Sequence, residues 1–255
     1  MQADKTKKNQ HPNSAYTILI CDDDDDILAA LRIYLTGEGY NVTEAHDGAE
    51  ALDIVRREQG NLHLILLDVM MPVMDGVHAA IQIRTFSNVP IIFLSAKGEE
   101  ADRVLGLHIG GDDYIVKPFT PIELFARTKS AIRRYADLGG LPSSGEDGAD
   151  AAEPGVFQTG GLMLDDNKKL VTVDGEPVTL TALEFGILKL LIASPDRVFS
   201  SAQIYEAVRQ EPAYDVSRII SVHVRHIREK IEANPKEPRY LKLVYGLGYK
   251  VPSLP

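Results

Sequence analysis

Short apolar runs alternate with segments of helical spacing over the first half of the chain. The apolar runs predict strands at residues 16–21, 40–44, 64–68, 89–95 and 114–117. Helical spacing predicts helices at residues 27–35, 49–57, 77–84, 99–109 and 121–135. Apolar residues follow one another without a polar gap at 64–67, as in a parallel strand that is covered on both faces. Strands alternating with helices in this way predict an α/β domain with a doubly wound, five-stranded parallel sheet.

The pattern changes in the second half of the chain. Residues 139–155 are rich in glycine, serine, proline and acidic residues, which is typical of a linker. Beyond it we expect short strands at 162–164, 169–173 and 177–180, helices at 181–193, 200–208 and 218–233, and a glycine-tipped hairpin at 240–251. Capping boxes, Thr181 with Glu184 and Ser200 with Gln203, begin the first two helices. The regions are a disordered tail at 1–15, the α/β domain at 16–135, a linker at 136–155 and an α+β domain at 156–253.

Composition and charge restrict the class of protein. The 255 residues carry a formal net charge of −10, so binding to nucleic acid requires basic residues that are concentrated locally. No apolar run approaches the roughly 18 residues of a membrane span, and the polar N-terminal tail differs from a secretory signal. The single cysteine, Cys21, fits a reducing compartment, so we expect a cytoplasmic protein without a membrane partner.

Polar side chains are predicted at the carboxyl edge of the parallel sheet. Asp22 and Asp23 follow the first strand, Asp68 and Ser95 end the third and fourth, and Lys117 ends the fifth. Ligands bind at this edge in open α/β sheets. Taken singly, each residue has an ordinary role as a helix cap or a surface charge. Neighbouring carboxylates repel one another, however, so we expect a cation between them, and hard oxygen ligands suit Mg²⁺.

This set of groups predicts phosphoryl transfer to a carboxylate. Asp68 would be the nucleophile and form an aspartyl phosphate. Mg²⁺ and Lys117 would neutralise charge on the phosphoryl oxygens. No base for repeated turnover of an external substrate stands out in the sequence.

The third helix of the second domain has two faces. A buried stripe is formed by Ile220, Val224, Ile227 and Ile231. The other side carries Arg218, Ser221, Val222, Arg225 and Arg228. An arginine row is usually a solvated face, but this helix follows two capped helices and precedes a hairpin, which predicts a winged helix-turn-helix with its recognition helix in the DNA major groove. Phosphate contacts are expected from Lys168, Lys169, Lys242 and Lys250.

The strand-end residues belong to longer motifs: Asp22-Asp23, Asp68-x-x-x-Pro72-x-x-Asp75-Gly76, Ser95-Ala96 and Lys117-Pro118-Phe119. On these motifs, residues 16–135 resemble the receiver domain of two-component response regulators, a flavodoxin-like fold. The resemblance implies that a sensor histidine kinase phosphorylates Asp68. It implies that Asp23, Asp68 and the Met70 backbone carbonyl bind Mg²⁺ directly and Asp22 through water. Ser95 would contact the phosphoryl group, and Tyr114 would be the switch aromatic that moves inward.

The second domain carries its own motifs, at residues 181–185, 222–228 and 246–249. On these it resembles the OmpR/PhoB-type effector domain, and within that family the chain looks somewhat like regulators of vancomycin-type resistance. The resemblance implies promoter DNA with direct or inverted half-sites, RNA polymerase as a partner, and a homodimer when phosphorylated. Across protomers of that dimer, Arg103 would pair with Glu123 and Asp113 with Arg127.

Several residues depart from the family pattern. His226 and Glu229 stand where many members carry basic residues, and Tyr245 stands in the wing where an arginine often reaches the minor groove. His108 stands where relatives often place an acid in the dimer network. Tyr245 and Lys242 remain expected DNA contacts of the wing.

Two other functions compete with a phosphorylation-controlled transcription factor. The first is an aspartyl-phosphate phosphotransferase that acts on small molecules. The second domain argues against it, because that domain adds arginines and no catalytic pocket. The second is a DNA-binding regulator whose first domain is a phosphate-independent dimerisation module. The complete set of strand-end residues, from Asp22 to Lys117, argues against that function.

Overall fold

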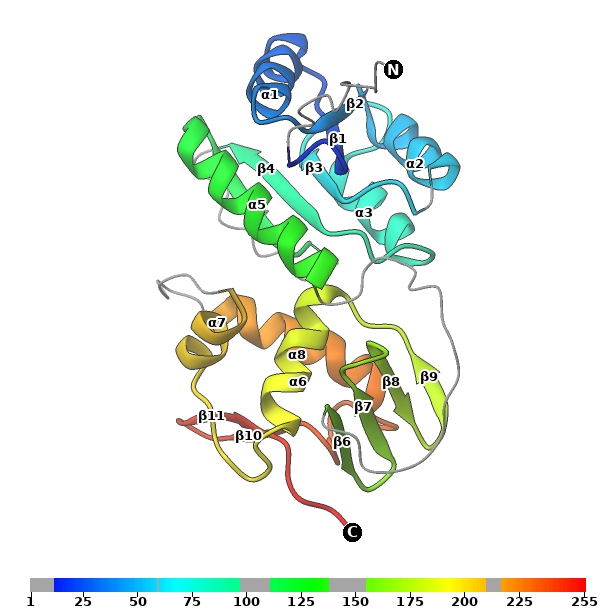
Figure 1. Ribbon diagram of the computed structural model, residues 1–255, viewed down its shortest axis with the longest axis vertical. Helices are drawn as coiled ribbons and strands as arrows, with labels where there is room; N and C mark the ends of the chain where they lie inside the picture. The colour runs from blue at the N-terminus through cyan, green and yellow to red at the C-terminus, as the bar shows by residue number, and fades with distance from the viewer. Residues whose placement is uncertain (1–11, 59, 97–110, 138–154, 210–216) are drawn as a thin grey trace, which may run out of the picture.

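The computed structural model describes residues 12–58, 60–96, 111–137, 155–209 and 217–255. Within these ranges the chain forms an α/β domain and a smaller domain, which lie one above the other in Figure 1. The helix expected at 99–109 and most of the expected linker fall outside the described residues.

The first domain is built on a parallel sheet in the order β2-β1-β3-β4-β5. Its strands are β1 Thr17–Cys21, β2 Asn41–Ala45, β3 Leu64–Asp68, β4 Ile91–Ala96 and β5 Asp113–Lys117. In the register of the central pairs, Ile18 lies opposite Leu64 and Ile65 lies opposite Ile91. This order is that of flavodoxin-like doubly wound folds, so the predicted fold class is confirmed.

Helices cover both faces of this sheet (Figure 1). They are α1 Asp25–Gly37, α2 Gly48–Arg57, α3 Gly76–Arg84 and α5 Pro121–Asp137. Because successive side chains of a strand point to opposite faces, Ile18 and Ile20 pack with α1 and α5, while Leu19 and Cys21 pack with α2 and α3. Every residue of β3 is buried, as its unbroken apolar run predicts. The carboxyl ends of the strands therefore meet at one edge between the two helical layers.

The second domain begins with an antiparallel sheet in the order β6-β7-β8-β9. Its strands are β6 Val156–Thr159, β7 Leu162–Asp165, β8 Leu170–Val173 and β9 Glu176–Val178. The sequence pattern predicts only the last three. β6 offers two large apolar residues, Val156 and Phe157, and its strand conformation depends on antiparallel pairing with β7.

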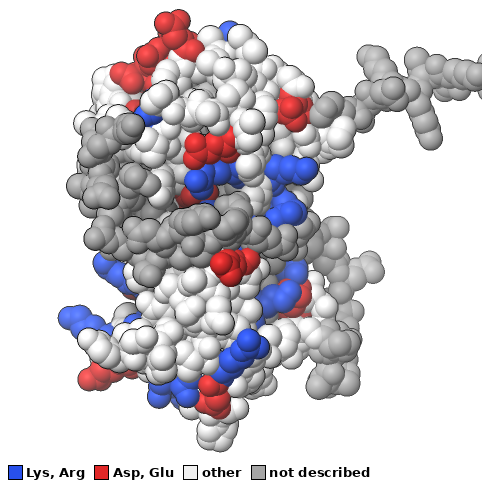
Figure 2. Space-filling model, turned by 90° about the vertical axis from the view of Figure 1, so that its left-hand side faces the viewer, with Lys and Arg blue, Asp and Glu red and all other residues white. Residues whose placement is uncertain are grey.

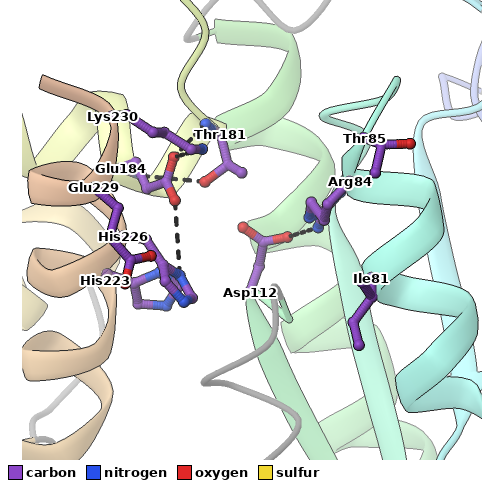
Figure 3. A pocket seen from close by; sticks show the side chains of 10 residues that line it. All are labelled: Ile81, Arg84, Thr85, Asp112, Thr181, Glu184, His223, His226, Glu229 and Lys230. Carbon is purple, nitrogen blue, oxygen red and sulfur yellow. Dashed lines mark hydrogen bonds and ion pairs between the residues drawn. The ribbon is translucent and has the colours of Figure 1, made fainter.

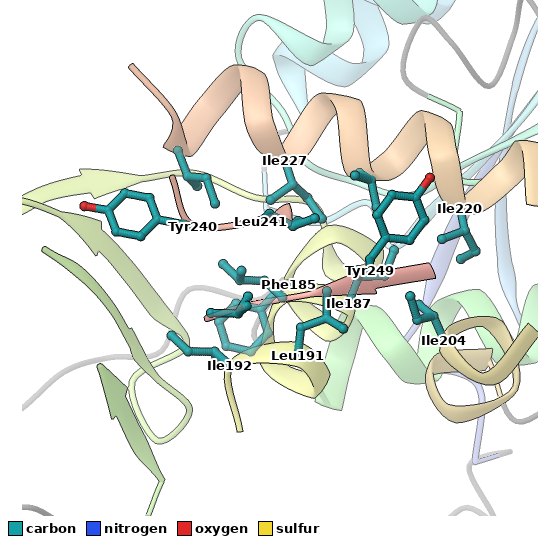
Figure 4. Packing of buried hydrophobic residues seen from close by; sticks show 14 of the residues in the cluster. Phe185, Ile187, Leu191, Ile192, Ile204, Ile220, Ile227, Tyr240, Leu241 and Tyr249 are labelled. Carbon is teal, nitrogen blue, oxygen red and sulfur yellow. The ribbon is translucent and has the colours of Figure 1, made fainter. Parts of the chain in front are cut away.

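The helices and hairpin of the second domain enclose its core. They are α6 Ala182–Ile192, α7 Ser201–Arg209, α8 Ser217–Ile231, β10 Lys242–Val244 and β11 Gly248–Lys250. Both predicted capping boxes are present, because the return bonds from Thr181 N to Glu184 and from Ser200 N to Gln203 are each 2.9 Å long. Figure 4 shows the apolar side chains of α6 and α8 packed with Tyr249 of β11. Among the described residues, no helix is both long and apolar enough to cross a membrane.

The hairpin is held against the connection between α6 and α7. Phe199 and Tyr249 exchange two backbone hydrogen bonds of 2.9 Å. Gly248 lies beside this bridge with a φ of +140°, and a Cβ atom there would stand 2.0 Å from the carbonyl oxygen of Phe199. Glycine is therefore required at the base of the wing, both for its backbone conformation and for this close approach.

Candidate functional site

Three carboxylates gather at the carboxyl edge of the parallel sheet. Asp22 follows β1 and Asp68 ends β3, and both are buried, whereas Asp23 is exposed. One carboxylate oxygen of each lies within 4.8 Å of the others. The cluster thus has a buried floor and one ligand that faces solvent, as a site that must admit an outside reactant requires.

Lys117 bridges two of these carboxylates from the end of β5. Its Nζ donates to Asp22 Oδ2 at 2.6 Å and to Asp68 Oδ1 at 2.5 Å. Burial lowers the pKa of Lys117, but the hydrogen bonds and charges of Asp22 and Asp68 outweigh burial, and its net pKa is raised. Burial raises the pKa of Asp68, and Lys117 opposes this only in part. The pKa of Lys117 is thus raised by its two carboxylate partners, whereas that of Asp68 is raised by burial. One ammonium shared by two carboxylates leaves negative charge for a cation to neutralise.

The loop after β3 folds tightly around Asp68. Met70 N donates to Asp68 Oδ2 at 2.8 Å, and Gly76 N donates to the Val69 carbonyl at 3.0 Å. A Cβ atom at Gly76 would stand 1.9 Å from the backbone oxygen of Asp68, so only glycine fits. Asp75 caps α3 by accepting from His78 N at 2.8 Å. The Asp75-Gly76 pair therefore shapes the loop that orients the Asp68 carboxylate.

Ser95 supplies a hydroxyl from the carboxyl end of β4, one residue beyond Leu94, which lies opposite Asp68 in the sheet register. The side chain is buried and its oxygen has no hydrogen-bond partner. Buried polar groups rarely remain unpaired, and an oxygen of a phosphoryl group on Asp68 would satisfy this one. The oxygen-only donor set of Asp22, Asp23 and Asp68 also fits Mg²⁺, which prefers carboxylates and water. The residues present therefore fit both the metal and the phosphoryl group.

Tyr114 lies between the two domains. It is half-buried and packs against a core cluster of the first domain and against the core of the second. The guanidinium carbon of Arg127 lies 6.0 Å from the centre of its ring. A movement of this ring would therefore change the contact between the domains.

Asp113, beside Tyr114, binds two arginines. It accepts from Arg127 Nη1 at 3.0 Å and from Arg209 Nη1. Burial alone would raise the pKa of Asp113, but the charges of Arg209 and Arg127 lower it. Arg127 also donates to Glu123 at 3.2 Å. The pairing of Asp113 with Arg127 thus occurs within one chain here, its exchange across protomers stays a prediction, and Arg103 lies outside the described residues.

Arg209 joins the second domain to the first. It ends α7, is fully buried, and donates to the Asp113 carboxylate and to the carbonyl oxygen of Asp112. Asp112 in turn accepts from Arg84 of α3 at 2.7 Å. Sequence reasoning missed Arg209 and Asp112, because a single arginine at a helix end carries no local signal of burial between domains.

The expected DNA-reading side chains of α8 differ in exposure. Ser221 and Arg225 are exposed, and Arg225 pairs with Glu229 at 2.7 Å. Val222 is only 3% exposed and belongs to the core cluster of the second domain, so the structure does not place it on the exposed face of α8. Arg228 donates its Nε to the Leu241 carbonyl at 2.9 Å and so anchors the hairpin. The described residues do not include the side chain of Arg218.

The wing presents its predicted contacts to solvent. Tyr245 is 95% exposed, and Lys242 is also exposed. On the face in Figure 2, lysine and arginine side chains are spread over the second domain with acidic side chains among them, and acidic side chains also gather at the far end of the first domain. The second domain thus exposes basic side chains on this face despite the acidic charge of the whole chain, as phosphate contacts require.

A cavity of about 400 Å³ lies between the domains (Figure 3). Its walls come from α3, Asp112, the start of α6 and one side of α8. His223 is buried in this wall, and its pKa is held well below the usual value, first by burial and then by the positive charge of Arg209. The cavity carries none of the residues predicted for phosphoryl transfer.

Comparison with known proteins assigns both halves of the chain. Residues 18–129 match the response regulator receiver domain, and residues 175–251 match the C-terminal domain of transcriptional regulatory proteins. The uncharacterized transcriptional regulatory protein YcbL of Bacillus subtilis is 39% identical over 236 residues, which cover 91% of this chain and 99% of YcbL. The sensory transduction protein RegX3 of Mycolicibacterium smegmatis is 36% identical over 235 residues, or 92% of this chain and 98% of RegX3.

Solved structures agree on the fold. A RitR mutant matches with a TM-score of 0.71 over 93% of this chain and 99% of that chain, at 21% sequence identity. The two-domain architecture is therefore shared with a protein of distant sequence.

Proposed function

Because this chain belongs to the two-component response regulators with an OmpR/PhoB-type DNA-binding domain, we propose that phosphorylation of Asp68 by a sensor histidine kinase controls its binding to promoter DNA. The family consists of transcriptional regulators rather than classical enzymes. One observation carries the proposal: the buried, unpaired hydroxyl of Ser95 and the ammonium of Lys117 both lie at the Asp68 site, ready for an added phosphoryl group.

The residues of the site divide the chemistry between them. An oxygen of Asp68 attacks the phosphorus of a phosphohistidine, the P–N bond breaks, and the imidazole leaves with a proton from solvent. Lys117 and Ser95 hold two of the phosphoryl oxygens. Asp23, Asp68 and the Met70 carbonyl would hold Mg²⁺ directly and Asp22 would hold it through water, and the ion would supply positive charge that offsets the charge of the transferring group.

The signal leaves the site through β5. Tyr114 and Asp113 lie on the strand that Lys117 ends, and both contact the second domain. When Lys117 and Ser95 engage a phosphoryl group, Tyr114 moves inward and the contact with the second domain weakens. Arg209 then releases Asp113, so that the receiver face becomes available to a second protomer, with Arg127 and Glu123 in the interface. The exposed side of α8 and the wing of each protomer bind one half-site, and the dimer recruits RNA polymerase in the cytoplasm.

Phosphoryl incorporation tests the proposal. Wild type, Asp68→Asn and Asp53→Asn would be treated with acetyl phosphate and Mg²⁺, and their intact masses compared. Asp53 is an exposed aspartate of α2 and serves as the matched control. We expect one phosphoryl group on wild type and on Asp53→Asn and none on Asp68→Asn. Labelling of Asp68→Asn, or of no variant, would overturn the assignment of the phosphoacceptor.

Salt dependence tests the DNA-binding half separately. A dimer that makes about ten phosphate contacts should show a slope of roughly −9 for log affinity against log salt concentration. The DNA would be a duplex selected from a random-sequence pool by the phosphorylated protein. A slope near zero contradicts DNA binding, and DNA binding that is equal with and without phosphorylation supports the phosphate-independent receiver instead.

A further inference from the structure

The cavity between the domains carries a cluster of donor atoms that the phosphorelay does not use. Glu184 of α6 and His223 and His226 of α8 each place one donor atom within 4.8 Å of the others. The two histidines are three residues apart and therefore lie on the same side of α8. Figure 3 shows their rings and the Glu184 carboxylate turned toward one another at the cavity wall.

His223 distinguishes this cluster from an ordinary polar contact. The residue is 2% exposed, and neither Nδ1 nor Nε2 has a hydrogen-bond partner. A buried ring with two unpaired nitrogens is rare, since burial without a partner forfeits the hydrogen bonds that water would make. A metal ion in the adjoining cavity would give one of these nitrogens a partner, and the cavity is large enough for the ion and bound water.

The Glu184 carboxylate is already oriented for such a role. Its Oε2 accepts from Thr181 N at 2.9 Å and from Lys230 Nζ at 2.6 Å. The other oxygen, Oε1, lies 3.9 Å from His226 Nδ1. Hydrogen bonds to one oxygen of a carboxylate fix the direction of the other, as outer partners do in known metal sites.

We propose that Glu184, His223 and His226 form a site for a divalent transition-metal ion, for which Zn²⁺ is the best chemical match. Two imidazoles and one carboxylate are a typical three-residue zinc set, with water completing the coordination. The hard ion Mg²⁺ prefers oxygen ligands, so it is expected at the acidic cluster rather than here. The two sites thus take different classes of metal.

Charged groups around the cavity set the strength of this site. Arg84 faces the cavity but is paired with Asp112 at 2.7 Å. Lys230 is the direct competitor, because its ammonium holds the same carboxylate that the ion needs. Its side chain is 34% exposed and can extend into solvent when an ion binds. Figure 3 shows the second oxygen of Asp112 directed toward the cavity, where it adds negative charge.

The location of the site connects metal binding to the helix that is expected to read DNA. α8 carries both histidines and the expected DNA-reading face, and the first domain closes the opposite wall of the cavity. An ion bound here would stiffen the attachment of α8 to α6 beside the contact between the two domains. The proposal stands whether or not Asp68 is phosphorylated, because none of its ligands belongs to the acidic cluster.

Metal titration of the full-length protein tests the proposal. Zn²⁺ would be titrated against a coloured chelator with saturating Mg²⁺ present, and Co²⁺ absorption would report nitrogen ligands. We expect one tight equivalent in wild type, and a loss of at least about tenfold in His223→Gln, His226→Gln and Glu184→Gln, the scale seen even for outer partners. Glutamine also serves in a capping box, so Glu184→Gln keeps the start of α6.

Three further variants make the outcome decisive. His46→Gln, at an exposed histidine, and Asp23→Asn, in the acidic cluster, should bind Zn²⁺ as wild type does. Lys230→Met should bind it more tightly, because the competing ammonium is gone. The proposal is overturned if wild type binds no tight equivalent, if Glu184→Gln and His223→Gln bind like wild type, or if Asp23→Asn alone abolishes binding.

Discussion

The acidic edge of the receiver and the seam between the domains both bury carboxylates, but they neutralise them differently. At the edge, Asp22 and Asp68 share the single ammonium of Lys117. At the seam, Asp113 accepts hydrogen bonds from two arginines, Arg127 and Arg209. The edge keeps excess negative charge and an unpaired hydroxyl, which a reaction can use. At the seam, two arginines neutralise the Asp113 carboxylate, and this contact links the two domains. One strand, β5, connects them, since Asp113 begins it and Lys117 ends it.

The largest effect should come from removing the cation at the edge. Lys117→Met leaves Asp22 and Asp68 without their shared partner and the phosphoryl oxygens without an ammonium. We expect phosphorylation from acetyl phosphate to slow by about 10²–10³-fold, the usual loss when one such donor is removed. Time courses of intact mass would measure the rate, with Lys129→Met on the exposed side of α5 as control. Equal rates in the two variants would contradict the role of Lys117.

Breaking the seam should have the next largest effect. Arg209→Met leaves the buried Asp113 with Arg127 alone, and removing one partner of a buried ion pair costs about 3–5 kcal/mol. We expect the docked arrangement to weaken and DNA binding without phosphorylation to rise by up to about 100-fold. Fluorescence anisotropy of labelled DNA would measure the affinity of the unphosphorylated variant for DNA.

The matched control for the seam is Arg197→Met. Arg209 lies over the ring of Tyr205, and Arg197 likewise lies over the ring of Phe199, but Arg197 is exposed and contacts no carboxylate of the seam. DNA binding by the Arg197→Met variant should remain dependent on phosphorylation. If Arg209→Met behaves like this control, the seam does not restrain the DNA-binding domain.

The contrast between edge and seam also explains which site residues could be predicted from the sequence and which could not. Asp22, Asp68, Ser95 and Lys117 each follow or end an apolar strand, so the chain pattern itself brings them to one edge. Arg209 gave no such signal, because its partner lies 96 residues away in another domain. A pairing between domains depends on how they dock, which no local pattern encodes.

Two smaller differences between the predicted and the observed structure also arise from contacts with elements that lie elsewhere in the chain. The stripe on α8 correctly predicted the buried residues Ile220, Val224, Ile227 and Ile231. It left Val222 on the outer side, but that residue is 3% exposed and belongs to the core cluster of the second domain. β6 was missed because its strand conformation depends on its neighbour β7 rather than on its own alternation.

A smaller effect is expected on the DNA-reading face. Arg225→Ala should reduce affinity for DNA by about 1–3 kcal/mol, because we expect Arg225 to contact a base edge. Because Arg225 is paired with Glu229 in the free protein, Glu229→Gln should strengthen binding slightly. Anisotropy with the phosphorylated protein would measure both. An unchanged affinity in Arg225→Ala would remove this residue from the DNA contacts.

The smallest effect on stability should come from the unpaired hydroxyl at the edge. Ser95→Ala removes no hydrogen bond within the protein, so the free energy of unfolding should change by less than about 0.5 kcal/mol. Phosphorylation should nevertheless slow. Thr128→Val is the matched control, because its buried hydroxyl is also unpaired but lies on α5. A large loss of stability in Ser95→Ala alone would show that the hydroxyl has a structural partner.

The central claim is that phosphorylation at the edge opens the seam. Hydrogen–deuterium exchange of α7 and α8, measured before and after treatment with acetyl phosphate and Mg²⁺, tests it most directly. We predict faster exchange at the start of α8 and at the end of α7 in phosphorylated wild type, and no change in Asp68→Asn. Complete phosphorylation of wild type with unchanged protection of α7 and α8 would contradict the claim.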